Sequence, residues 1–227
     1  MNPISMLNKF EISLCKDESL ATLLRIEDDL LGLPEFDINL YDKSHTAIIF
    51  MDVLSGFVTE GNLSSDRALV ILDALKNLDE QTEGFSKVYF ADHHTKDSVE
   101  FGAYPPHCLI DTPETEFAIK FDTTHPKSTI ITKNCVNGFL APAFSEWLAL
   151  HDYIKTFIVV GLVTDICVMN FSLTLKAYLN QWNIHASVII PMSMVETFDL
   201  PATNHLAPLM NLFALYNMKM NGILLTK

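Results

Sequence analysis

The chain has 227 residues, 49% of them hydrophobic, and carries 15 Lys and Arg against 28 Asp and Glu, a formal net charge of −13. This size and apolar content suit one domain with a sizeable core, with or without an appendage. The basic residues are few and scattered, which argues against binding of a phosphate backbone, so we expect no nucleic-acid partner.

The amino-terminal sequence shows no basic stretch followed by an apolar run, and no segment reaches the length that spans a membrane. We therefore expect a cytoplasmic protein with no membrane partner. The four cysteines are widely spaced and contain no Cys-x-x-Cys pair, which argues against a disulfide framework or a structural zinc site. They are Cys15, Cys108, Cys135 and Cys167.

Residues 1–42 mix acidic and apolar positions, with a helix-like pattern from Leu20 to Leu31 that ends near Gly32 and Pro34. We predict an N-terminal appendage over residues 1–42 and a main domain over residues 43–227. A packing arm at a contact between the subunits of a homo-oligomer is one role that we consider for the appendage.

From there on, short apolar runs recur along the chain, of the kind typical of strands buried on both faces. They lie at residues 46–51, 87–91, 128–132, 157–160, 186–190 and 223–225. Helical patterns separate them, clearest after Ser65-Asp66 and also around residues 142–151 and 165–181. The alternation predicts an α/β fold, with a doubly wound, mostly parallel six-stranded sheet and helices on both faces. Residues 191–201 lack clear periodicity and predict a loop over the site.

Ligands of such sheets bind at the carboxyl ends of the strands. Asp52 follows the first predicted strand, Asp92-His93-His94 the second, Lys133 the third, and a turn leading to Cys167 the fourth. Each has an ordinary explanation alone: a turn cap, a solvated lysine or a small buried thiol. Four successive strand ends with ionisable or nucleophilic groups together favour an active site.

Cys167 is the candidate nucleophile. Thr164 or Asp165 is a good N-cap, which would place the thiol in the first turn of a helix. The helix dipole there stabilises the thiolate, which is the reactive form of cysteine.

A second cluster has the composition of a metal site. Asp92 and His94 are followed by Glu100 and by His107, which ends the stiff segment Tyr104-Pro105-Pro106-His107. A carboxylate and two imidazoles suit zinc, manganese or iron. A polar surface loop is the alternative, and the Pro-Pro-His sequence favours the metal.

From about Thr46 to the C-terminus the chain resembles the nicotinamidase branch of the isochorismatase-like cysteine hydrolases, most strongly in the segment from Gly161 to Val168. The resemblance implies Cys167 as nucleophile, Asp52 and Lys133 as its catalytic partners, and a cis peptide between Leu162 and Val163. It also implies further site residues: the backbone N–H groups of Val163 and Cys167 as the oxyanion hole, Phe57 and Tyr104 as substrate contacts, Asp92, His94 and His107 as metal ligands, and Glu100 as a fourth ligand.

The resemblance further implies the isochorismatase-like hydrolase fold and one divalent metal ion, with zinc first and iron or manganese as alternatives. Its activity would convert nicotinamide to nicotinic acid and ammonia through a cysteine thioester, a step of NAD salvage. Three segments depart from the family pattern and bear on the substrate more than on the reaction: Val53-Leu54-Ser55-Gly56, the stretch after His107-Cys108 with Asp111 and Glu114, and Val136-Asn137-Gly138.

Three alternatives remain at this point. The same catalytic residues could act on another small amide or on a carbamoyl or ureido compound. A binding module could keep the fold without activity. An isochorismate-type vinyl ether hydrolase is disfavoured, because those enzymes lack the cysteine.

Overall fold

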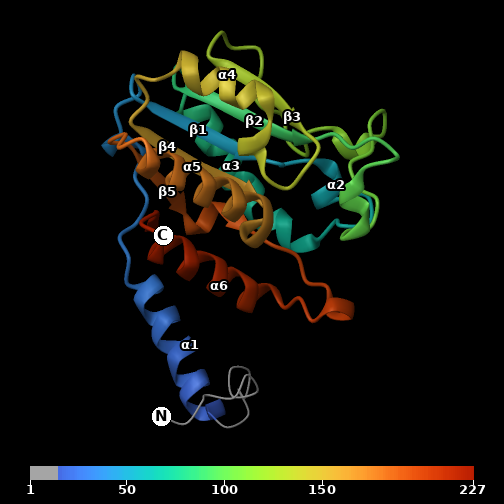
Figure 1. Ribbon diagram of the computed structural model, residues 1–227, viewed down its shortest axis with the longest axis vertical. Coiled ribbons are helices and arrows are strands. Elements are labelled where there is room, and N and C mark those ends of the chain that lie inside the picture. The colour runs from blue at the N-terminus through green and yellow to red at the C-terminus, as the bar shows by residue number, and fades with distance from the viewer. Residues whose placement is uncertain (1–14) are drawn as a thin grey trace.

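The computed structural model describes residues 15–227 and contains one parallel β-sheet (Figure 1). Its strands follow the order β3-β2-β1-β4-β5-β7, while β6 pairs with β4, and every pairing is parallel. The bounds are β1 Thr46–Met51, β2 Ser86–Asp92, β3 Ser128–Lys133, β4 Thr156–Leu162, β5 Ser187–Pro191, β6 Val195–Glu196 and β7 Leu224–Thr226.

All six predicted strands are present, and the doubly wound parallel sheet is confirmed. The structure adds one short strand, β6, to the six predicted ones, inside the region 191–201 that we expected to be a loop. A strand of two residues is too short to produce an alternating pattern, so the sequence carries no signal for it.

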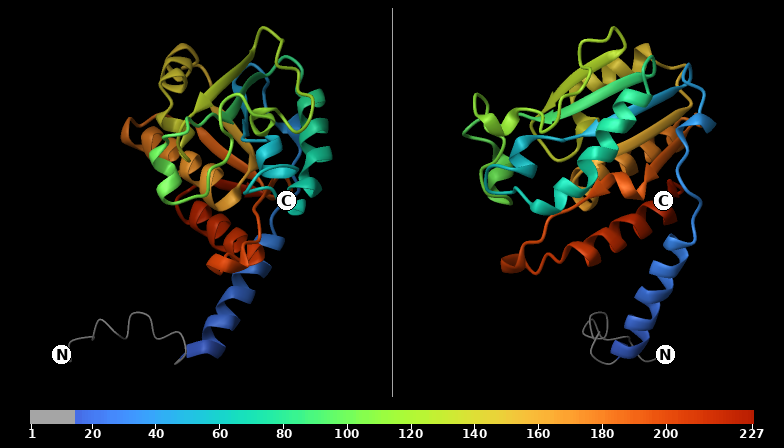
Figure 2. Two further views of the ribbon diagram at one scale, coloured as in Figure 1. Left: turned by 90° about the vertical axis from the view of Figure 1, so that its right-hand side faces the viewer. Right: turned by 180° about the vertical axis from the view of Figure 1, so that it is seen from behind.

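Helices cover both faces of the sheet (Figures 1 and 2). The α-helices are α1 Lys16–Leu31, α2 Ser55–Val58, α3 Leu69–Gln81, α4 Pro142–Leu150, α5 Met169–Gln181 and α6 Ala207–Met220. Short 3₁₀ helices span Ile38–Leu40, Asp66–Ala68, Val99–Gly102, Pro113–Thr115, Gly138–Leu140, Met192–Met194 and Pro201–Thr203, and a π-helix spans Thr164–Val168.

Two hydrophobic cores lie on the two faces of the sheet. In β1, Ala47, Ile49 and Met51 belong to one core, whereas Ile48 and Phe50 belong to the other. This split follows from the strand period of two, which sends successive side chains to opposite faces. Side chains of α4, α5 and α6 fill the first core, and those of α2 and α3 fill the second.

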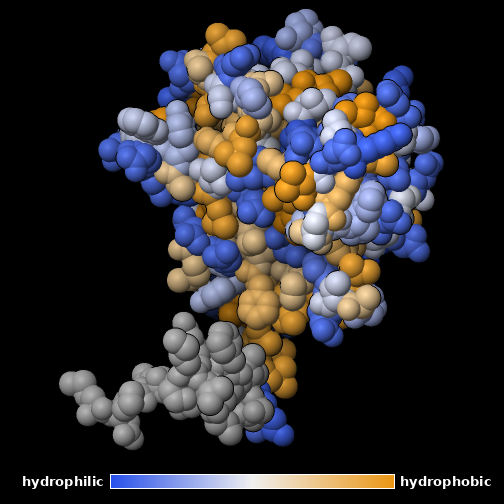
Figure 3. Space-filling model, turned by 45° about the vertical axis from the view of Figure 1, so that its right-hand side comes forward, coloured by the Kyte–Doolittle hydropathy of each residue, from blue (hydrophilic) through white to orange (hydrophobic). Residues whose placement is uncertain are grey.

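The helix α1 projects from the body in all three ribbon views (Figures 1 and 2) and contacts α6. Its last turn is anchored, since Leu30 is buried in the first core, while Leu20 and Leu24 are exposed. The lower part of the coloured surface in Figure 3 is partly hydrophobic. Pro34 and Phe36 exchange backbone hydrogen bonds with Lys227. The division at residue 42 stays a prediction, and residues 1–14 of that appendage lie outside the described residues.

The sheet order determines where a site can form. The chain moves outward from β1 to β2 and β3 and then returns to place β4 on the other side of β1. Where the winding reverses, the connections leave in opposite directions and open a crevice at the carboxyl ends of β1 and β4. Within residues 15–227, no helix combines the length and apolar character needed to cross a membrane.

Candidate active site

Four predicted site residues meet at the carboxyl edge of the sheet. Asp52 follows β1, Asp92 ends β2, and Lys133 ends β3 in register with Asp92. Cys167 lies in the π-helix that follows β4. All four residues are at most 4% exposed. One oxygen each of Asp52 and Asp92 and the sulfur of Cys167 lie within 4.8 Å of one another.

Lys133 lies at the centre of this group. Its Nζ is 2.7 Å from Oδ2 of Asp52 and 2.6 Å from Oδ1 of Asp92, and it is 3.7 Å from Sγ of Cys167. Burial lowers the pKa of Lys133, but the two carboxylates outweigh burial and raise that pKa well above its ordinary value. Lys133 therefore stays a cation, and its single charge is shared by two buried carboxylates.

The two carboxylates have opposite pKa shifts. Burial and the charge of Asp92 raise the pKa of Asp52 to about 6, against the opposing effect of Lys133. Burial also acts on Asp92, but the charge of Lys133 holds the pKa of Asp92 well below its usual range. Asp52 is therefore the carboxylate that can exchange a proton near neutral pH, and Asp92 stays ionised.

The thiol of Cys167 is more difficult to ionise than the sequence predicts. Burial, together with the charges of Asp52 and Asp92, raises its pKa well above the ordinary value and outweighs Lys133. The expectation that Cys167 is a thiolate is not met in the free protein, because desolvation and the two carboxylates disfavour the anion. Ionisation of this thiol therefore needs a nearby base, and one oxygen of Asp52 lies within 4.8 Å of its sulfur.

The π-helix that carries Cys167 begins after Val163, which is its N-cap. The predicted caps Thr164 and Asp165 both lie inside the helix, so that prediction is wrong. The predicted cis peptide between Leu162 and Val163 is present. Short π-helical segments are frequent at functional sites.

The predicted metal ligands gather beside Asp52, Lys133 and Cys167. Ligand atoms of Asp92, His94 and His107 lie within 4.8 Å of one another, and all three residues are buried. Nε2 of His94 is 3.5 Å from Oδ1 of Asp92, and Nε2 of His107 is 3.8 Å from its Oδ2. Glu100 lies at the edge of this group, with Oε1 3.9 Å from Nε2 of His94, while its Oε2 accepts the backbone N–H of Val136.

The surroundings of these residues fit a metal ion. Nδ1 of His94 lies 3.0 Å from Oδ1 of Asn134, and Nδ1 of His107 lies 2.9 Å from the carbonyl oxygen of Pro105. These acceptors place the ring proton on Nδ1 and leave the lone pair of Nε2 free for a ligand bond. Within residues 15–227, Nε2 of His94 and Oε1 of Glu100 are buried atoms without a hydrogen-bond partner. Two imidazoles and a carboxylate, with a second carboxylate at the edge, suit zinc or a similar divalent ion.

A narrow pocket joins the nucleophile to the metal-ligand group. The free volume of this pocket is about 10 Å³, which is close to the space that one water molecule needs. Both predicted substrate contacts line it, and their rings lie 5.6 Å (Phe57) and 6.3 Å (Tyr104) from the ring of His107. The full lining is Phe57, Leu63, Asp92, Glu100, Tyr104, His107, Val136, Val163, Ile166, Cys167 and Phe198.

The site contains residues that were not predicted for it: Leu63, Val136 and Ile166 of the pocket lining, together with Asn134 and Phe198. Asn134 orients His94, and its position next to Lys133 at a strand end is the only sequence signal for that role. Phe198 lines the pocket from the region 191–201. A lone phenylalanine among polar residues carries no periodicity, although its place after the strand β5 falls at the edge where ligands bind.

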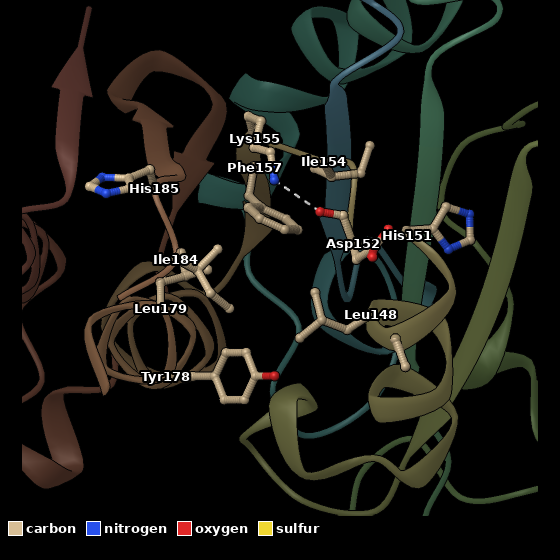
Figure 4. A pocket seen from close by; sticks show the side chains of 11 residues that line it. Leu148, His151, Asp152, Ile154, Lys155, Phe157, Tyr178, Leu179, Ile184 and His185 are labelled. Carbon is tan, nitrogen blue, oxygen red and sulfur yellow. Dashed lines mark hydrogen bonds between the residues drawn. The ribbon is translucent and has the colours of Figure 1, made fainter. Parts of the chain in front are cut away.

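Another pocket, of about 530 Å³, lies at the opposite edge of the sheet. Figure 4 shows its lining from the ends of α4 and α5 and from the start of β4, including Leu148, Tyr178 and Phe157, with Lys155 donating to the carbonyl oxygen of Asp152. None of the predicted site residues lines it. This pocket is therefore not the place where the reactive groups meet.

Comparisons with known proteins give a consistent result. The sequence model described as "Isochorismatase domain" matches residues 46–184. Nicotinamidase 1 of Arabidopsis thaliana is 29% identical over 180 residues, which are 70% of this chain and 72% of that protein.

Solved structures share the fold. A nicotinamidase from Bacillus subtilis has a TM-score of 0.68 at 22% identity, over 81% of this chain and 99% of that one. A pyrazinamidase of Pyrococcus horikoshii in complex with zinc has a TM-score of 0.66 at 20% identity, over 81% and 99%. An N-carbamoylsarcosine amidase from Thermoplasma acidophilum has a TM-score of 0.63 at 19% identity, over 80% and 95%. At these identities the structures establish the fold but do not assign a substrate.

Proposed function

The chain belongs to the isochorismatase-domain family of hydrolases, and we propose that it is a metal-containing amidohydrolase that converts nicotinamide to nicotinic acid and ammonia. The observation that carries the proposal is the convergence of Asp52, Lys133 and Cys167 beside a buried group of metal-ligand type, around one pocket. The similarity to the Arabidopsis nicotinamidase supports the choice of substrate.

In the first half of the reaction, Asp52 accepts the proton of the Cys167 thiol, and the sulfur attacks the carboxamide carbon. The pKa of Asp52, raised to about 6, suits this task, because its carboxylate is ionised at neutral pH but takes up a proton easily. The tetrahedral intermediate then expels ammonia, to which Asp52 returns the proton. The product of this half is a thioester on Cys167.

In the second half, water attacks the thioester carbon and gives a proton to Asp52. The intermediate expels the sulfur of Cys167, which takes the proton back, and nicotinic acid leaves. Lys133 holds Asp52 in place through the ion pair of 2.7 Å and prevents its pKa from rising further.

The oxyanion of both intermediates needs two donors. We assign the backbone N–H groups of Val163 and Cys167, both of which line the pocket. Each such donor is worth about 3 kcal/mol of transition-state stabilisation. We assign Phe57 and Tyr104 to contacts with the flat ring.

We assign Asp92, His94 and His107 as metal ligands and Glu100 as a fourth. A bound zinc ion would supply a Lewis acid that holds the ring nitrogen and so orients the carboxamide toward the sulfur. A zinc complex is known for the pyrazinamidase of similar fold. Asn134 and the carbonyl oxygen of Pro105 would hold the rings of His94 and His107 in the orientation that ligands need.

A second candidate is a carbamoyl or ureido compound acted on by the same three residues. The shared fold with an N-carbamoylsarcosine amidase favours it. The buried histidines favour nicotinamide instead, because a substrate without a ring nitrogen has less use for a metal. A silent binding module would have no need for a buried thiol, carboxylate and lysine in contact.

One experiment tests the nucleophile and the substrate together. Wild-type protein loaded with zinc should release ammonia from nicotinamide, and Cys167→Ala should abolish this release while its zinc content stays near that of the wild type. Cys135→Ala is the matched control, since its half-buried thiol lies in the loop after β3, outside the pocket lining. Substantial turnover by Cys167→Ala would show that the nucleophile is wrongly assigned. Activity on carbamoyl compounds without activity on nicotinamide would select the second candidate.

We also propose a cytoplasmic location. Within residues 15–227, Cys108, Cys135 and Cys167 are free thiols, which fits a reducing compartment. Fractionation of cells with detection of the native protein tests this proposal.

A further inference from the structure

One wall of the narrow pocket is formed by Phe198. This residue belongs to residues 195–206, which we call the 195–206 segment. It starts as β6, which pairs with Gly161 and Leu162 just before the nucleophile turn. It ends at α6, where Asp199 accepts the first backbone N–H of the helix from Ala207. Between these points Leu200 and His205 exchange two backbone hydrogen bonds. The segment therefore forms a closed hairpin beside the site.

Phe198 is the residue through which this segment reaches the pocket. Its side chain lines the pocket together with Val163, Ile166 and Cys167 and is only 7% exposed. The ring of His205 stacks on it, with centroids 4.4 Å apart and an interplanar angle of 22°. One ring at the pocket wall is thus supported by a second ring behind it.

His205 is itself tied to the nucleophile helix. Its Nε2 lies 2.8 Å from Oδ2 of Asp165, and its Nδ1 lies 2.8 Å from the carbonyl oxygen of Phe198. The other oxygen of Asp165 accepts the hydroxyl of Thr197 at 2.6 Å. Asp165 stands two residues before Cys167, so both oxygens of this one carboxylate connect the 195–206 segment to the helix that carries the nucleophile.

We propose that Phe198 contacts the ring of the substrate and selects planar aromatic amides, and that Asp165 and His205 are positioning residues that hold Phe198 in place. The choice of ring rests on the proposed function. Because Phe198 lines the same narrow pocket as Cys167 and His107, a substrate ring that enters the pocket would lie against Phe198. Asp165 and His205 do not line the pocket, so they act through Phe198.

Steady-state kinetics test the positioning. Asp165→Asn and His205→Phe each remove the charged hydrogen bond, and His205→Phe keeps a ring against Phe198. We expect each variant to raise KM for nicotinamide about tenfold with kcat changed much less, since an ångström of misplacement can cost up to 10²-fold. The double variant should have a KM no higher than that of either single variant, because both substitutions break the same hydrogen bond between Asp165 and His205. Additive effects, or losses in kcat alone, would contradict the positioning role.

The specificity role has its own comparison. Phe198→Ala should lose most of its preference for nicotinamide over a small aliphatic amide, and Phe198→Leu should lose less. Thr203→Ala is the matched control, because Thr203 lies in the same segment, is exposed and bonds only the carbonyl oxygen of Leu200. An unchanged ratio of kcat/KM for the two amides in Phe198→Ala would overturn this role.

A readout without substrate separates this inference from the proposed function. Alkylation of Cys167 by iodoacetamide, followed by peptide mass spectrometry, reports access to the pocket. We expect Phe198→Ala, Asp165→Asn and His205→Phe to speed it about tenfold at unchanged melting temperature, and Thr203→Ala to leave it unchanged. Equal rates in all variants would overturn the inference. If the wild type released no ammonia from nicotinamide, the proposed function and the choice of ring would be wrong, while faster alkylation would still support the positioning of Phe198.

Discussion

Nζ of Lys133 lies 2.6 Å from Oδ1 of Asp92, and the same nitrogen lies 2.7 Å from Oδ2 of Asp52. Asp52 belongs to the group around the nucleophile, and Asp92 belongs to the group of metal-ligand type. One buried cation therefore couples the two halves of the site, and a change at Lys133 should reach both.

Lys133→Met should damage stability, activity and metal binding together. It would leave Asp52 and Asp92 buried without a counter-ion, which costs about 3–5 kcal/mol when one partner of a buried pair is removed. We expect this loss in urea unfolding, along with a loss of activity of about 10³-fold and a change in zinc affinity. Lys43→Met, at an exposed lysine, is the control and should leave all three unchanged. Activity near that of the wild type in Lys133→Met would contradict the coupling.

The pH profile should report Asp52. Its pKa is raised to about 6 by burial and by Asp92, and only the ionised carboxylate can accept the proton of Cys167. Below pH 6 the carboxyl is protonated, so kcat/KM should fall about tenfold for each further pH unit and should level off above pH 6. An acid limb centred near pH 4, the range of an ordinary carboxyl, would contradict the raised pKa of Asp52. Asp52→Asn should abolish the activity on which the limb depends.

Asn134 should matter for metal binding although it is no ligand. Its side chain fixes Nδ1 of His94 at 3.0 Å, and loss of such an orienting partner typically costs 10–100-fold in metal affinity. We expect Asn134→Ala to weaken zinc binding by about that factor, and His94→Ala to weaken it more. His93→Ala is the control, because the side chain of His93 is outside the ligand group. Zinc titration with a competing chelator measures all three.

The chelator experiment also tests the need for metal. Removal of zinc should abolish ammonia release, and added zinc should restore it. Glu100→Gln should have a smaller effect on zinc affinity than His107→Ala, because Oε2 of Glu100 is already engaged by the backbone N–H of Val136. Full activity of the metal-free protein would contradict the orienting role that we assign to the ion.

Gly161→Ala should destabilise the junction of β1 and β4. Gly161 has a φ of +114°, and an added Cβ would lie 2.2 Å from the carbonyl oxygen of Met51. We expect a loss of more than about 2 kcal/mol in urea unfolding, with a loss of activity because β4 leads into the turn that carries Cys167. In Gly102→Ala the added Cβ meets no described atom within 4 Å, so this control should stay within about 0.5 kcal/mol of the wild type.

The sequence predicts much of the fold because buried parallel strands leave a strong local signal. The apolar run at residues 46–51 becomes β1 with the same bounds, and the helical pattern that ends near Gly32 becomes α1, which ends at Leu31. β6 was missed because two residues form no pattern and its pairing with β4 is a long-range contact.

The sequence by itself determined which residues follow the strands, and therefore that Asp52, Asp92, Lys133 and Cys167 would share one edge of the sheet. Only the tertiary structure decided how they act on one another. The pKa of the thiol is raised where the sequence suggested a thiolate, because burial and two nearby carboxylates act through space. In the same way Asn134 and His94 are 40 residues apart, as are His205 and Asp165, and no local pattern can encode a hydrogen bond that forms only when distant segments pack together.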